Sequence, residues 1–392
     1  MIRKDLPDDS VLLFWTDYLA AGEVPFSYQV AGGLSTLGAL LRRSRWVDQV
    51  DWMVYPNQSI LFIGPSGIGK DTIINRCSSI LTALEVESRV PTIGGCTMEL
   101  IHARLETLSK PAAAYIPAPE ITAFFGKSDY QANMLTGITN LLSNGERVDI
   151  STKGSWMSRG GPSLILQPTI TMHAGSTVEW LHKGMPDGTL EGGFMGRFLI
   201  CCEELDPTRR QMPLLKRDRT RDDITSIKGS LEVWREFLRE LTVRCQRTPR
   251  EMILLPEAED LYANWYYNRF RLFSRAVQPY ANRSRDMVLR LGMLMALSRG
   301  HDRWIEDVDI GFAIQVIGEL AARIDAVVLP PSIEAQVAMK ILEMLPATMG
   351  EVYMQMGLRF SIPKQIDPAL DLLRRTGKIR MDGKVVRKEG DE

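Results

Sequence analysis

The sequence predicts an α/β core preceded by a helical segment and followed by a helical region and a winged helix. Between residues 57 and 205, short apolar runs typical of buried strands alternate with stretches of helical periodicity, which is the pattern of an α/β domain. A glycine-rich loop directly follows the first of these apolar runs and leads into a helix. Near the carboxyl end, three helical stretches precede a hairpin about Asp382-Gly383, as in a winged helix.

The overall composition limits the functions to consider. The chain has 392 residues, of which 45% are apolar and 24% are charged, and its net charge is −1. A chain of this length usually forms two or three domains, because single domains run to ~100–200 residues. The small net charge excludes a global attraction to nucleic acid or membranes, so any site for a polyanion must be a local patch. The sequence contains no apolar run of ~18 residues, which predicts that no segment spans a membrane.

The cysteines and the amino-terminal residues indicate the cellular compartment of the protein. The five cysteines are odd in number and form no Cys-x-x-Cys motif, which favours reduced thiols over a disulfide framework. The amino-terminal residues lead into an acidic stretch rather than into the apolar run of a signal peptide. We therefore expect a cytoplasmic protein.

Four regions follow one another along the chain. Residues 1–56 read as helical, and residues 57–221 form the α/β core, which ends in a charged connector. Residues 222–329 again read as helices. Pro330-Pro331 then breaks the helical pattern before the winged helix of residues 332–392.

The loop between the first core strand and its helix is the most specific motif in the sequence. Ser59 to Ile63 has the composition of a buried strand. The loop after it consists of Gly64, Pro65, Ser66, Gly67, Ile68, Gly69 and Lys70. Glycines let backbone N–H groups turn toward phosphates, and the helix N-terminus adds partial positive charge. Because Lys70 would contact the β- and γ-phosphates, the motif predicts a P-loop that binds ATP.

The position after the lysine departs from the consensus of this loop. The consensus has Ser or Thr there, as a ligand of Mg²⁺, whereas this chain has Asp71 followed by Thr72. Asp71 could bind the metal directly, since a carboxylate oxygen suits this hard ion, although its charge would lie beside the phosphates. Alternatively, Thr72 binds the metal through a shifted register. The sequence leaves both assignments open.

A second acidic group is expected where another core strand ends. Ala112 to Ile116 is the best candidate strand, and Glu120 follows shortly after it. Glu120 would polarise the attacking water or support the metal. The usual Asp-Glu pair is absent, so the alternative is an exposed Glu120 that caps the next helix.

The segment from Tyr55-Pro56-Asn57 through the glycine-rich loop resembles a family of phage and mobile-element ATPases of unknown function. These are similar to AAA+ helicases of the superfamily 3 and minichromosome maintenance types. The resemblance extends from about residue 14 to about residue 325, and the loop is its specific motif. It implies an AAA+-like core, ATP and Mg²⁺ as cofactors, and assembly into a hexameric ring.

The same resemblance implies a function. The first possibility is a DNA-dependent ATPase that serves as the replicative helicase of a phage or mobile element, in the cytoplasm of a bacterial host if a phage encodes it. The alternative is a helicase loader or replication initiator, which would use ATP as an assembly switch without separating strands. Either would act with DNA and other replication proteins.

The segment Glu191 to Phe198, which precedes the strand Leu199 to Cys202, is similar to the segment that carries an arginine finger in ring helicases. Arg197 would then act on the ATP of a neighbouring subunit and stabilise the transition state. The alternative is a surface arginine at the edge of a strand.

Upstream, Ile165 to Ala174 resembles the core strand that carries a sensor of the γ-phosphate. The candidates for this sensor are Ser176, His173 and Thr177, and we assign Ser176 to the nucleotide site. A histidine in this strand could equally be a buried core residue with satisfied hydrogen bonds.

Residues 147–161 read as a strand, a glycine-rich turn and a return strand. Ring helicases often place a DNA-gripping hairpin at this point. The resemblance implies that Lys153 and Arg159 contact phosphates and that Trp156 stacks on a base. A plain surface hairpin is the alternative.

The helical region contains a segment, residues 282–291, that resembles the lid helix of AAA+ proteins. A second sensor arginine in such a helix contacts the γ-phosphate. Arg283, Arg285 and Arg290 are the candidates, and Arg285 is preferred because it stands at the polar start of the apolar helix.

The winged helix is basic. Between residues 360 and 388, eight basic side chains stand against three acidic ones. We expect Arg374, Arg375, Lys378 and Arg380 to contact DNA, although many winged helices bind only protein.

Overall fold

The computed structural model shows two compact units of mixed α/β structure, Met1–Val328 and Leu329–Glu392. The structure describes residues 5–20, 22–93, 98–123, 129–143, 145–150, 163–184, 193–204, 221–273, 277–328, 337, 341, 344–357, 366–375, 379–382 and 385–388. Within these ranges, every helix is too short or too polar to span a lipid bilayer.

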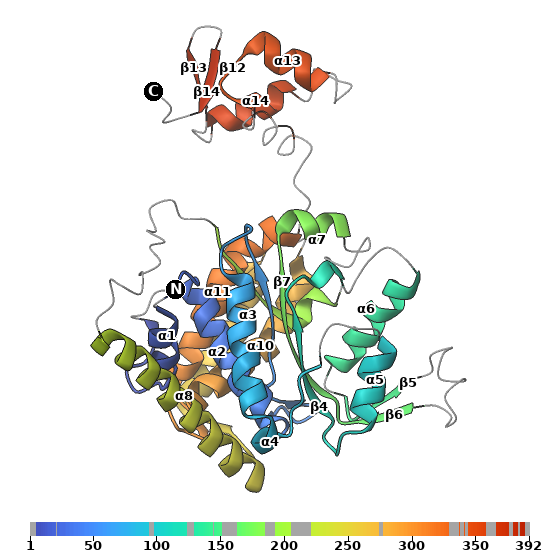
Figure 1. The fold of residues 1–392 in the computed structure, drawn as a ribbon, viewed down its shortest axis with the longest axis vertical. Helices are drawn as coiled ribbons and strands as arrows, with labels where there is room; N and C mark the ends of the chain where they lie inside the picture. The colour runs from blue at the N-terminus through green and yellow to red at the C-terminus, as the bar shows by residue number, and fades with distance from the viewer. Residues whose placement is uncertain are drawn as a thin grey trace. The chain divides into compact units, whose positions relative to one another are not determined.

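A four-stranded parallel sheet lies in the first unit (Figure 1). Its strands are β3 (Ser59–Ile63), β4 (Ala113–Ala118), β7 (Thr169–Ser176) and β8 (Phe198–Cys202), in the order β4-β7-β3-β8. Every residue of β3 and β7 is buried, as expected for parallel strands that helices cover on both faces. Because all four strands run the same way, the sheet has a carboxyl edge, where the strands end, and an amino edge, where they begin.

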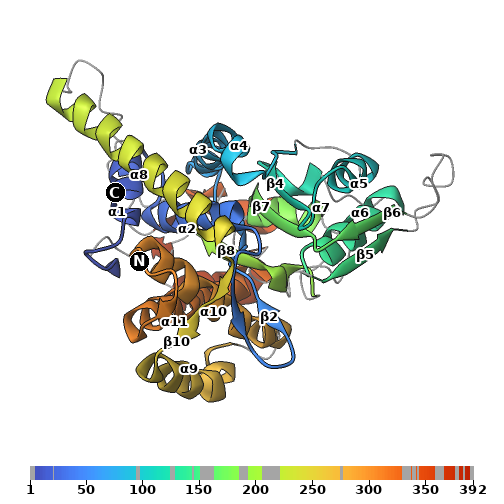
Figure 2. The ribbon, with the colours of Figure 1, turned by 90° about the horizontal axis from the view of Figure 1, so that it is seen from below.

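Helices pack against this sheet and against one another (Figure 2). α2 (Phe26–Leu41) contacts β3, β7 and α3 (Lys70–Ala83) and is buried over most of its length. Gly38 lets α2 pack closely against the segment before β3, since a Cβ on this residue would lie 2.3 Å from the carbonyl oxygen of Pro56. The other helices of the first unit are α1 (Leu12–Ala20), α4 (Glu85–Ser88), α5 (Met98–Glu106), α6 (Asp129–Leu141), α7 (Val178–Gly184), α8 (Arg221–Arg247), α9 (Pro256–Asn268), α10 (Gln278–Ser298) and α11 (Asp307–Val328).

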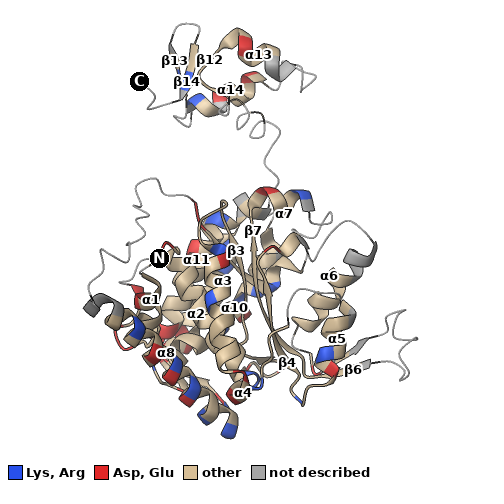
Figure 3. Cartoon of the chain, viewed as in Figure 1, with Lys and Arg blue, Asp and Glu red and all other residues tan. Residues whose placement is uncertain are grey.

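The long helix α8 is amphipathic. Trp234, Leu238 and Leu241 are buried at the i, i+4, i+7 spacing of one helix face. Trp234 packs against Trp15 of α1, with the ring centroids 6.1 Å apart and the ring planes tilted by 32°. Basic and acidic side chains alternate along the outer side of α8 (Figure 3), as expected for its solvated face.

Five short strands also belong to the first unit. The strands are β1 (Arg45–Asp48), β2 (Met53–Val54), β9 (Arg250–Glu251), β10 (Ile253–Leu254) and β11 (Trp304–Ile305). Two of them, β1 and β2, lie within residues 1–56, so this region is helical only in part. β1 pairs antiparallel with β2 and parallel with β9, and β10 pairs parallel with β11. The fully buried Arg45 holds β1 in place through an ion pair with Asp302 at 2.9 Å. A helical reading of this segment missed β1, which pairs both with the nearby β2 and with β9, about two hundred positions away.

The predicted strand Ile165 to Ala174 is divided between two sheets. β6 (Ser163–Leu166) pairs antiparallel with β5 (Arg147–Ile150), and β7 begins directly after Pro168. Pro168 has no N–H to donate to a ladder, and Gln167 has a φ of 49°, so the chain turns between the strands. The first strand of the predicted hairpin is therefore present as β5, but its return strand is β6, which lies beyond the predicted range of residues 147–161.

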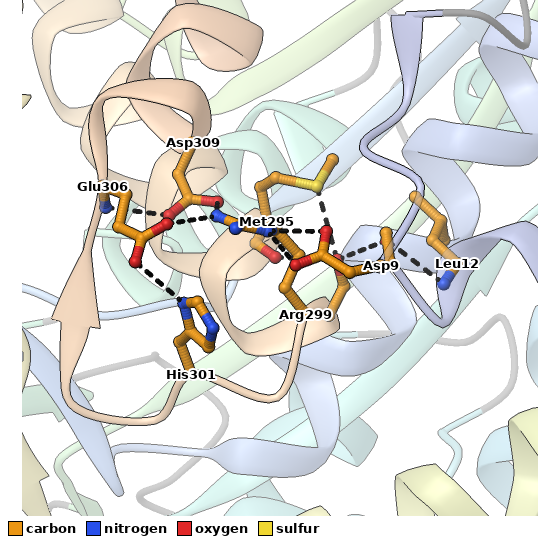
Figure 4. A network of polar contacts seen from close by, with 9 residues as sticks. Asp9, Leu12, Met295, Arg299, His301, Glu306 and Asp309 are labelled. Carbon is orange, nitrogen blue, oxygen red and sulfur yellow. Dashed lines mark hydrogen bonds and ion pairs between the residues drawn. The ribbon is translucent and has the colours of Figure 1, made fainter.

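Arg299 ties the start of the chain to the end of α10 (Figure 4). Its Nε lies 2.9 Å from both carboxylate oxygens of Asp9. Beside this pair, the hydroxyls of Ser10 and Ser298 are 2.7 Å apart. The hydrogen bond from Arg299 lowers the pKa of Asp9.

The same guanidinium also reaches the start of α11. Its Nη1 lies 3.0 Å from Glu306 Oε2 and 3.1 Å from Asp309 Oδ1. His301, Glu306 and Asp309 are close enough together to offer ligands to a metal ion. Arg299 lies among these carboxylates and balances their charge, so the cluster is explained as an ion-pair network.

The second unit has its own small core. α13 (Met349–Gly357) and α14 (Ile366–Arg375) pack with a three-stranded antiparallel sheet. The strands are β12 (Ala347–Thr348), β13 (Ile379–Asp382) and β14 (Val385–Lys388), in the order β12-β14-β13. The pairing of Ile379 with Lys388 confirms the predicted hairpin, although Asp382 pairs with Val385 and so is the last residue of β13 rather than part of the turn.

Candidate functional site

The glycine-rich loop lies at the carboxyl edge of the sheet, between β3 and α3. Gly67 and Gly69 have φ values of 82° and 98°, in the left-handed region that favours glycine. Gly64 has no room for a side chain, because a Cβ there would lie 2.7 Å from the carbonyl oxygen of Glu203. The loop ends where α3 begins at Lys70. The N–H groups of the first turn of α3 could therefore bind an anion held by the loop.

Lys70 is the buried cation of this loop. Its Nζ donates hydrogen bonds to the carbonyl oxygens of Gly64 at 2.7 Å and Pro65 at 2.8 Å. An ammonium group has three N–H donors, so one is left for a ligand. Burial lowers the pKa of Lys70, while the negative charges of Asp71 and Glu120 act in the opposite direction. A phosphate would add to that stabilisation of the charged lysine.

The remaining residues of the loop segment differ in exposure. Ile68 is buried and anchors the loop to the core, whereas Ser66 is exposed. Asp71 and Thr72 are also exposed, as the second and third residues of α3. Both side chains lie in the first turn of α3, directly after the loop, so either could offer an oxygen to Mg²⁺.

Ser176 connects Glu120 to the loop. It ends β7 directly beside Ile63, the last residue of β3. Its Oγ donates to Glu120 Oε1 at 2.8 Å, and its carbonyl oxygen accepts the N–H of Gly64 at 3.3 Å. Thr122 also donates to Glu120 Oε1, from its Oγ1 at 2.8 Å and from its backbone N–H at 3.3 Å. No donor among the described residues contacts Oε2, which leaves that oxygen for a water or a metal.

The other two sensor candidates have structural partners. His173 is fully buried, with Nδ1 3.1 Å from the Tyr115 hydroxyl and Nε2 2.6 Å from Ser35 Oγ. Burial lowers the pKa of His173 to about 3, so the ring is neutral at ordinary pH. Thr177 Oγ1 accepts the N–H of Trp180 at the start of α7. Of the three candidates, Ser176 is the one in contact with both Glu120 and the loop.

Two charged residues near the loop escaped the sequence analysis. The N–H of Glu203, which follows β8, donates to Ile63 O at 2.9 Å, and its carboxylate accepts a hydrogen bond from Ser27. Arg323 of α11 lies 2.7 Å from Cys202 O and 3.6 Å from Glu203 Oε1. Glu203 could have been found as an acidic residue at the end of an apolar core strand. Nothing in the sequence connects Arg323 to that edge.

Arg197 lies at the amino edge of the same sheet. It directly precedes β8, whose first residue, Phe198, pairs with Ser59 at the start of β3. The loop follows at the far end of β3, and a strand rises ~3.3 Å per residue, so the backbone of Arg197 lies roughly 15 Å from the loop. Its guanidinium donates to Ser143 Oγ at 2.7 Å. Arg197 is therefore remote from the loop of its own chain.

Two further arginines join Arg197 at this edge. Arg283 and Arg290 are seven positions apart and so share a face of α10. A Cβ on Gly196 would lie 2.6 Å from Arg283 Cδ, so Arg283 packs directly on that glycine. Burial, together with the charges of Arg283 and Arg290, lowers the pKa of Arg197 to about 10. Among the described residues, the Nε of Arg290 has no hydrogen-bond partner, although Asp286 acts on its charge. An anion would relieve this excess of positive charge.

Arg285, the preferred second sensor, has other partners. Its guanidinium lies 4.3 Å above the ring of Trp52, and its Nε is 3.4 Å from Asp286. Two positions after Arg283, it points to a different side of α10. The structure brings Arg283, rather than Arg285, to Arg197.

The residues predicted to bind nucleic acid are described only in part. Those outside the described residues are Lys153, Trp156, Arg159 and Lys378. Arg375 is the last residue of α14. Arg374 and Arg380 are exposed, and Arg374 lies 3.8 Å from Asp371.

No protein-family model and no curated protein matches the sequence. What the protein does is therefore inferred from the arrangement of its own residues. Two arrangements are informative: Lys70, Glu120 and Ser176 around the loop at the carboxyl edge, and the arginine cluster of Arg197, Arg283 and Arg290 at the amino edge.

Proposed function

We propose that the protein is an oligomeric, AAA+-like P-loop ATPase that acts on DNA and uses ATP and Mg²⁺. The observation that carries the proposal is the convergence of the Gly64–Lys70 loop, Glu120 and Ser176 at one edge of a parallel sheet. In open α/β sheets, ligands bind outside the carboxyl ends of the strands. Phosphoryl transfer requires groups that hold the phosphates and a group that orients the attacking water, and this edge offers both.

Each group has a distinct part in the proposed hydrolysis. The loop N–H groups and Lys70 hold the phosphates, and Asp71 or Thr72 holds Mg²⁺. The unengaged Oε2 of Glu120 polarises the attacking water. Ser176 fixes the other carboxylate oxygen of Glu120 through the 2.8 Å hydrogen bond, which sets the direction of Oε2.

The position of Arg197 supports assembly into an oligomer. Because it stands roughly a strand length from the loop of its own chain, Arg197 can serve as a finger only for a neighbouring copy. Arg283 would accompany it, since it packs on the adjacent Gly196. A hexameric ring is the assembly implied by the family resemblance, in which residues 222–329 would form the lid.

The proposed partner is DNA. The family resemblance implies that Lys153, Trp156 and Arg159, which follow β5 in the sequence, contact DNA, and the second unit would be a winged helix carrying basic side chains. A replicative helicase is our first choice. A loader or initiator would use the same ATP site without strand separation, so a strand-displacement assay with the purified protein distinguishes the two.

The experiment that tests the proposal is ATP hydrolysis with and without single-stranded DNA, together with the particle mass in ATP. We expect Lys70→Ala to abolish hydrolysis and to weaken ATP binding, because a hydrogen bond to a charged group contributes ~1.5–3 kcal/mol. Lys228→Ala is the matched control, since Lys228 is an exposed lysine on α8. Hydrolysis by Lys70→Ala at the rate of the unaltered chain would refute the proposal.

A further inference from the structure

A pocket is lined by residues of β1, of the turn between β1 and β2, and of α9. Figure 2 shows where β2 and α9 lie in the first unit. The volume of the pocket is about 410 Å³, within the range of small-ligand and side-chain pockets. Val47 to Gln49 and Trp52 line one side, and Glu251 to Leu254 line another. Residues of α9 and Arg285 complete the lining. None of the residues that the proposed function assigns to ATP chemistry belongs to the lining.

Aromatic rings form the walls of this pocket. Tyr262, Tyr266 and Tyr267 follow one another on α9, and Trp52 faces them from the ribbon. Tyr266 and Tyr267 meet edge to face, with centroids 5.6 Å apart. Tyr267 is 80% exposed and Trp52 is 36% exposed. Exposed aromatic rings around a hollow are typical of recognition sites, because they bind large apolar or cationic groups with little loss of side-chain entropy.

The charge of the lining indicates what it binds. Asp48, Glu251 and Glu259 carry carboxylates there, and among the described residues none of the three takes part in an ion pair. Among the described residues, Arg285 is the one cation of the lining, and it already lies 4.3 Å above Trp52 and 3.4 Å from Asp286. Outside the lining, the guanidinium of Arg269 lies 3.9 Å from the centroid of the Tyr266 ring. The pocket therefore has an excess of negative charge next to aromatic faces, a combination that attracts a guanidinium or ammonium group.

Exposed apolar side chains at the edge of the pocket indicate which kind of partner fits. Ile253 is 48% exposed beside the pocket, and Met53 of β2 is also exposed. Such a rim suits apolar side chains on either side of the cation. A phosphate backbone would instead meet three carboxylates, so the electrostatics disfavour a nucleic acid.

We propose that this pocket, the Trp52–Tyr267 pocket, docks a segment of a partner protein that presents an arginine or lysine side chain flanked by apolar residues. The cation enters between the tyrosines of α9 and the carboxylates of Glu251 and Glu259. The flanking apolar side chains cover Trp52 and Ile253. The existing contact of Arg285 with Trp52 shows that this ring accepts a guanidinium on its face.

The test is calorimetric titration of the full chain with a short peptide in which one arginine is flanked by leucines. A peptide with citrulline in place of arginine has nearly the same shape without the charge. We expect the arginine peptide to bind at one site and the citrulline peptide to bind at least several-fold more weakly. Glu251→Gln and Glu259→Gln should each weaken the arginine peptide by up to about fivefold, as expected for partly exposed ion pairs.

Two controls keep the experiment decisive. Glu257→Gln alters an exposed carboxylate on the same helix α9, outside the pocket, and should leave peptide binding unchanged. Tyr267→Ala removes a ring that is 80% exposed, so we expect the fold to persist and the binding of both peptides to weaken. Equal binding of the two peptides, or equal effects of Glu257→Gln and Glu259→Gln, would overturn the proposal. Binding of oligothymidylate that Tyr267→Ala abolishes would identify a nucleic-acid surface instead.

Discussion

The two edges of the central sheet carry opposite chemistry. At the carboxyl edge, Lys70 is satisfied by loop carbonyls and lies near the carboxylates of Asp71 and Glu120. At the amino edge, Arg283 and Arg290 act on the charge of Arg197, and Asp286 acts on that of Arg290. These edges cannot meet within one chain, because β3 and β8 separate them by roughly 15 Å. A site that needs both is complete only where one copy meets another, which is the arrangement we propose for ATP hydrolysis.

The most severe test of this comparison is Arg197→Ala. A finger that acts in trans contributes ~10³–10⁵ in rate elsewhere, so hydrolysis should fall by a similar factor while ATP binding persists. The guanidinium is suited to this role because it is planar, permanently charged and able to bond two oxygens at once. The measurements are steady-state ATPase activity and equilibrium binding of a fluorescent ATP analogue.

Mixing the two inactive variants sharpens this test. Lys70→Ala subunits still carry Arg197, and Arg197→Ala subunits still carry Lys70. Mixed assemblies should regain part of the hydrolysis at interfaces where the intact Arg197 faces the intact loop. A monomer with full activity, or normal hydrolysis by Arg197→Ala alone, would show that the two edges do not form a shared site.

Within the carboxyl edge, Glu120 and Ser176 should differ in effect by orders of magnitude. Glu120→Gln removes the proposed activator of water and should slow hydrolysis by ~10²–10⁴. Ser176→Ala removes one hydrogen bond to the other carboxylate oxygen, a loss of about 1 kcal/mol or roughly fivefold. Thr177→Ala is the matched control, because its hydroxyl accepts the Trp180 N–H rather than contacting Glu120. If single-turnover rates put Thr177→Ala level with Ser176→Ala, the orienting role of Ser176 is lost.

The last prediction concerns stability rather than rate, and the residue is His173 of β7. Burial holds its pKa at about 3 in the folded chain, against ~6.5 when unfolded. Between these two pKa values the unfolded state binds a proton that the folded state does not bind. The contribution of His173 to the free energy of unfolding is therefore fully present above pH 6.5 and is lost as the pH falls toward 3. This group should make the first unit about 2 kcal/mol less stable at pH 5 than at pH 7.

Urea unfolding followed by tryptophan fluorescence can measure this difference, because all eight tryptophans precede residue 329 and so report on the first unit. His173→Gln should remove the added pH dependence, even though it lowers stability at both pH values. An unchanged difference between pH 5 and pH 7 in that variant would mean that another group titrates.

The features that the sequence predicted well are those with local causes. β3 begins and ends where composition indicated, since a buried apolar run meets glycines that only a tight loop requires. The hairpin after α14 follows from a two-residue turn. The proximity of Glu120 and Ser176 to the loop follows from the rule that parallel strands end at a common edge.

The features that it missed depend on distant partners. Periodicity places Arg283 and Arg285 on one helix but does not tell which faces Arg197, because that depends on the packing of Gly196. Arg323 reaches Cys202 across 121 positions. In each case the deciding contact joins segments far apart in the chain.

The Arg299 network has a consequence for how the chain is made. Ser10 and Ser298, which meet beside the Asp9–Arg299 pair, are separated by 288 positions. At ~5–20 residues per second, roughly 15 to 60 s of synthesis separate the appearance of the two. The amino-terminal helix therefore leaves the ribosome among the first elements of the first unit, yet it gains these anchors only after α10 has emerged. During that interval Leu12 and Trp15 lack part of their final packing, and the nascent chain depends on other contacts, or on a chaperone, to shield them.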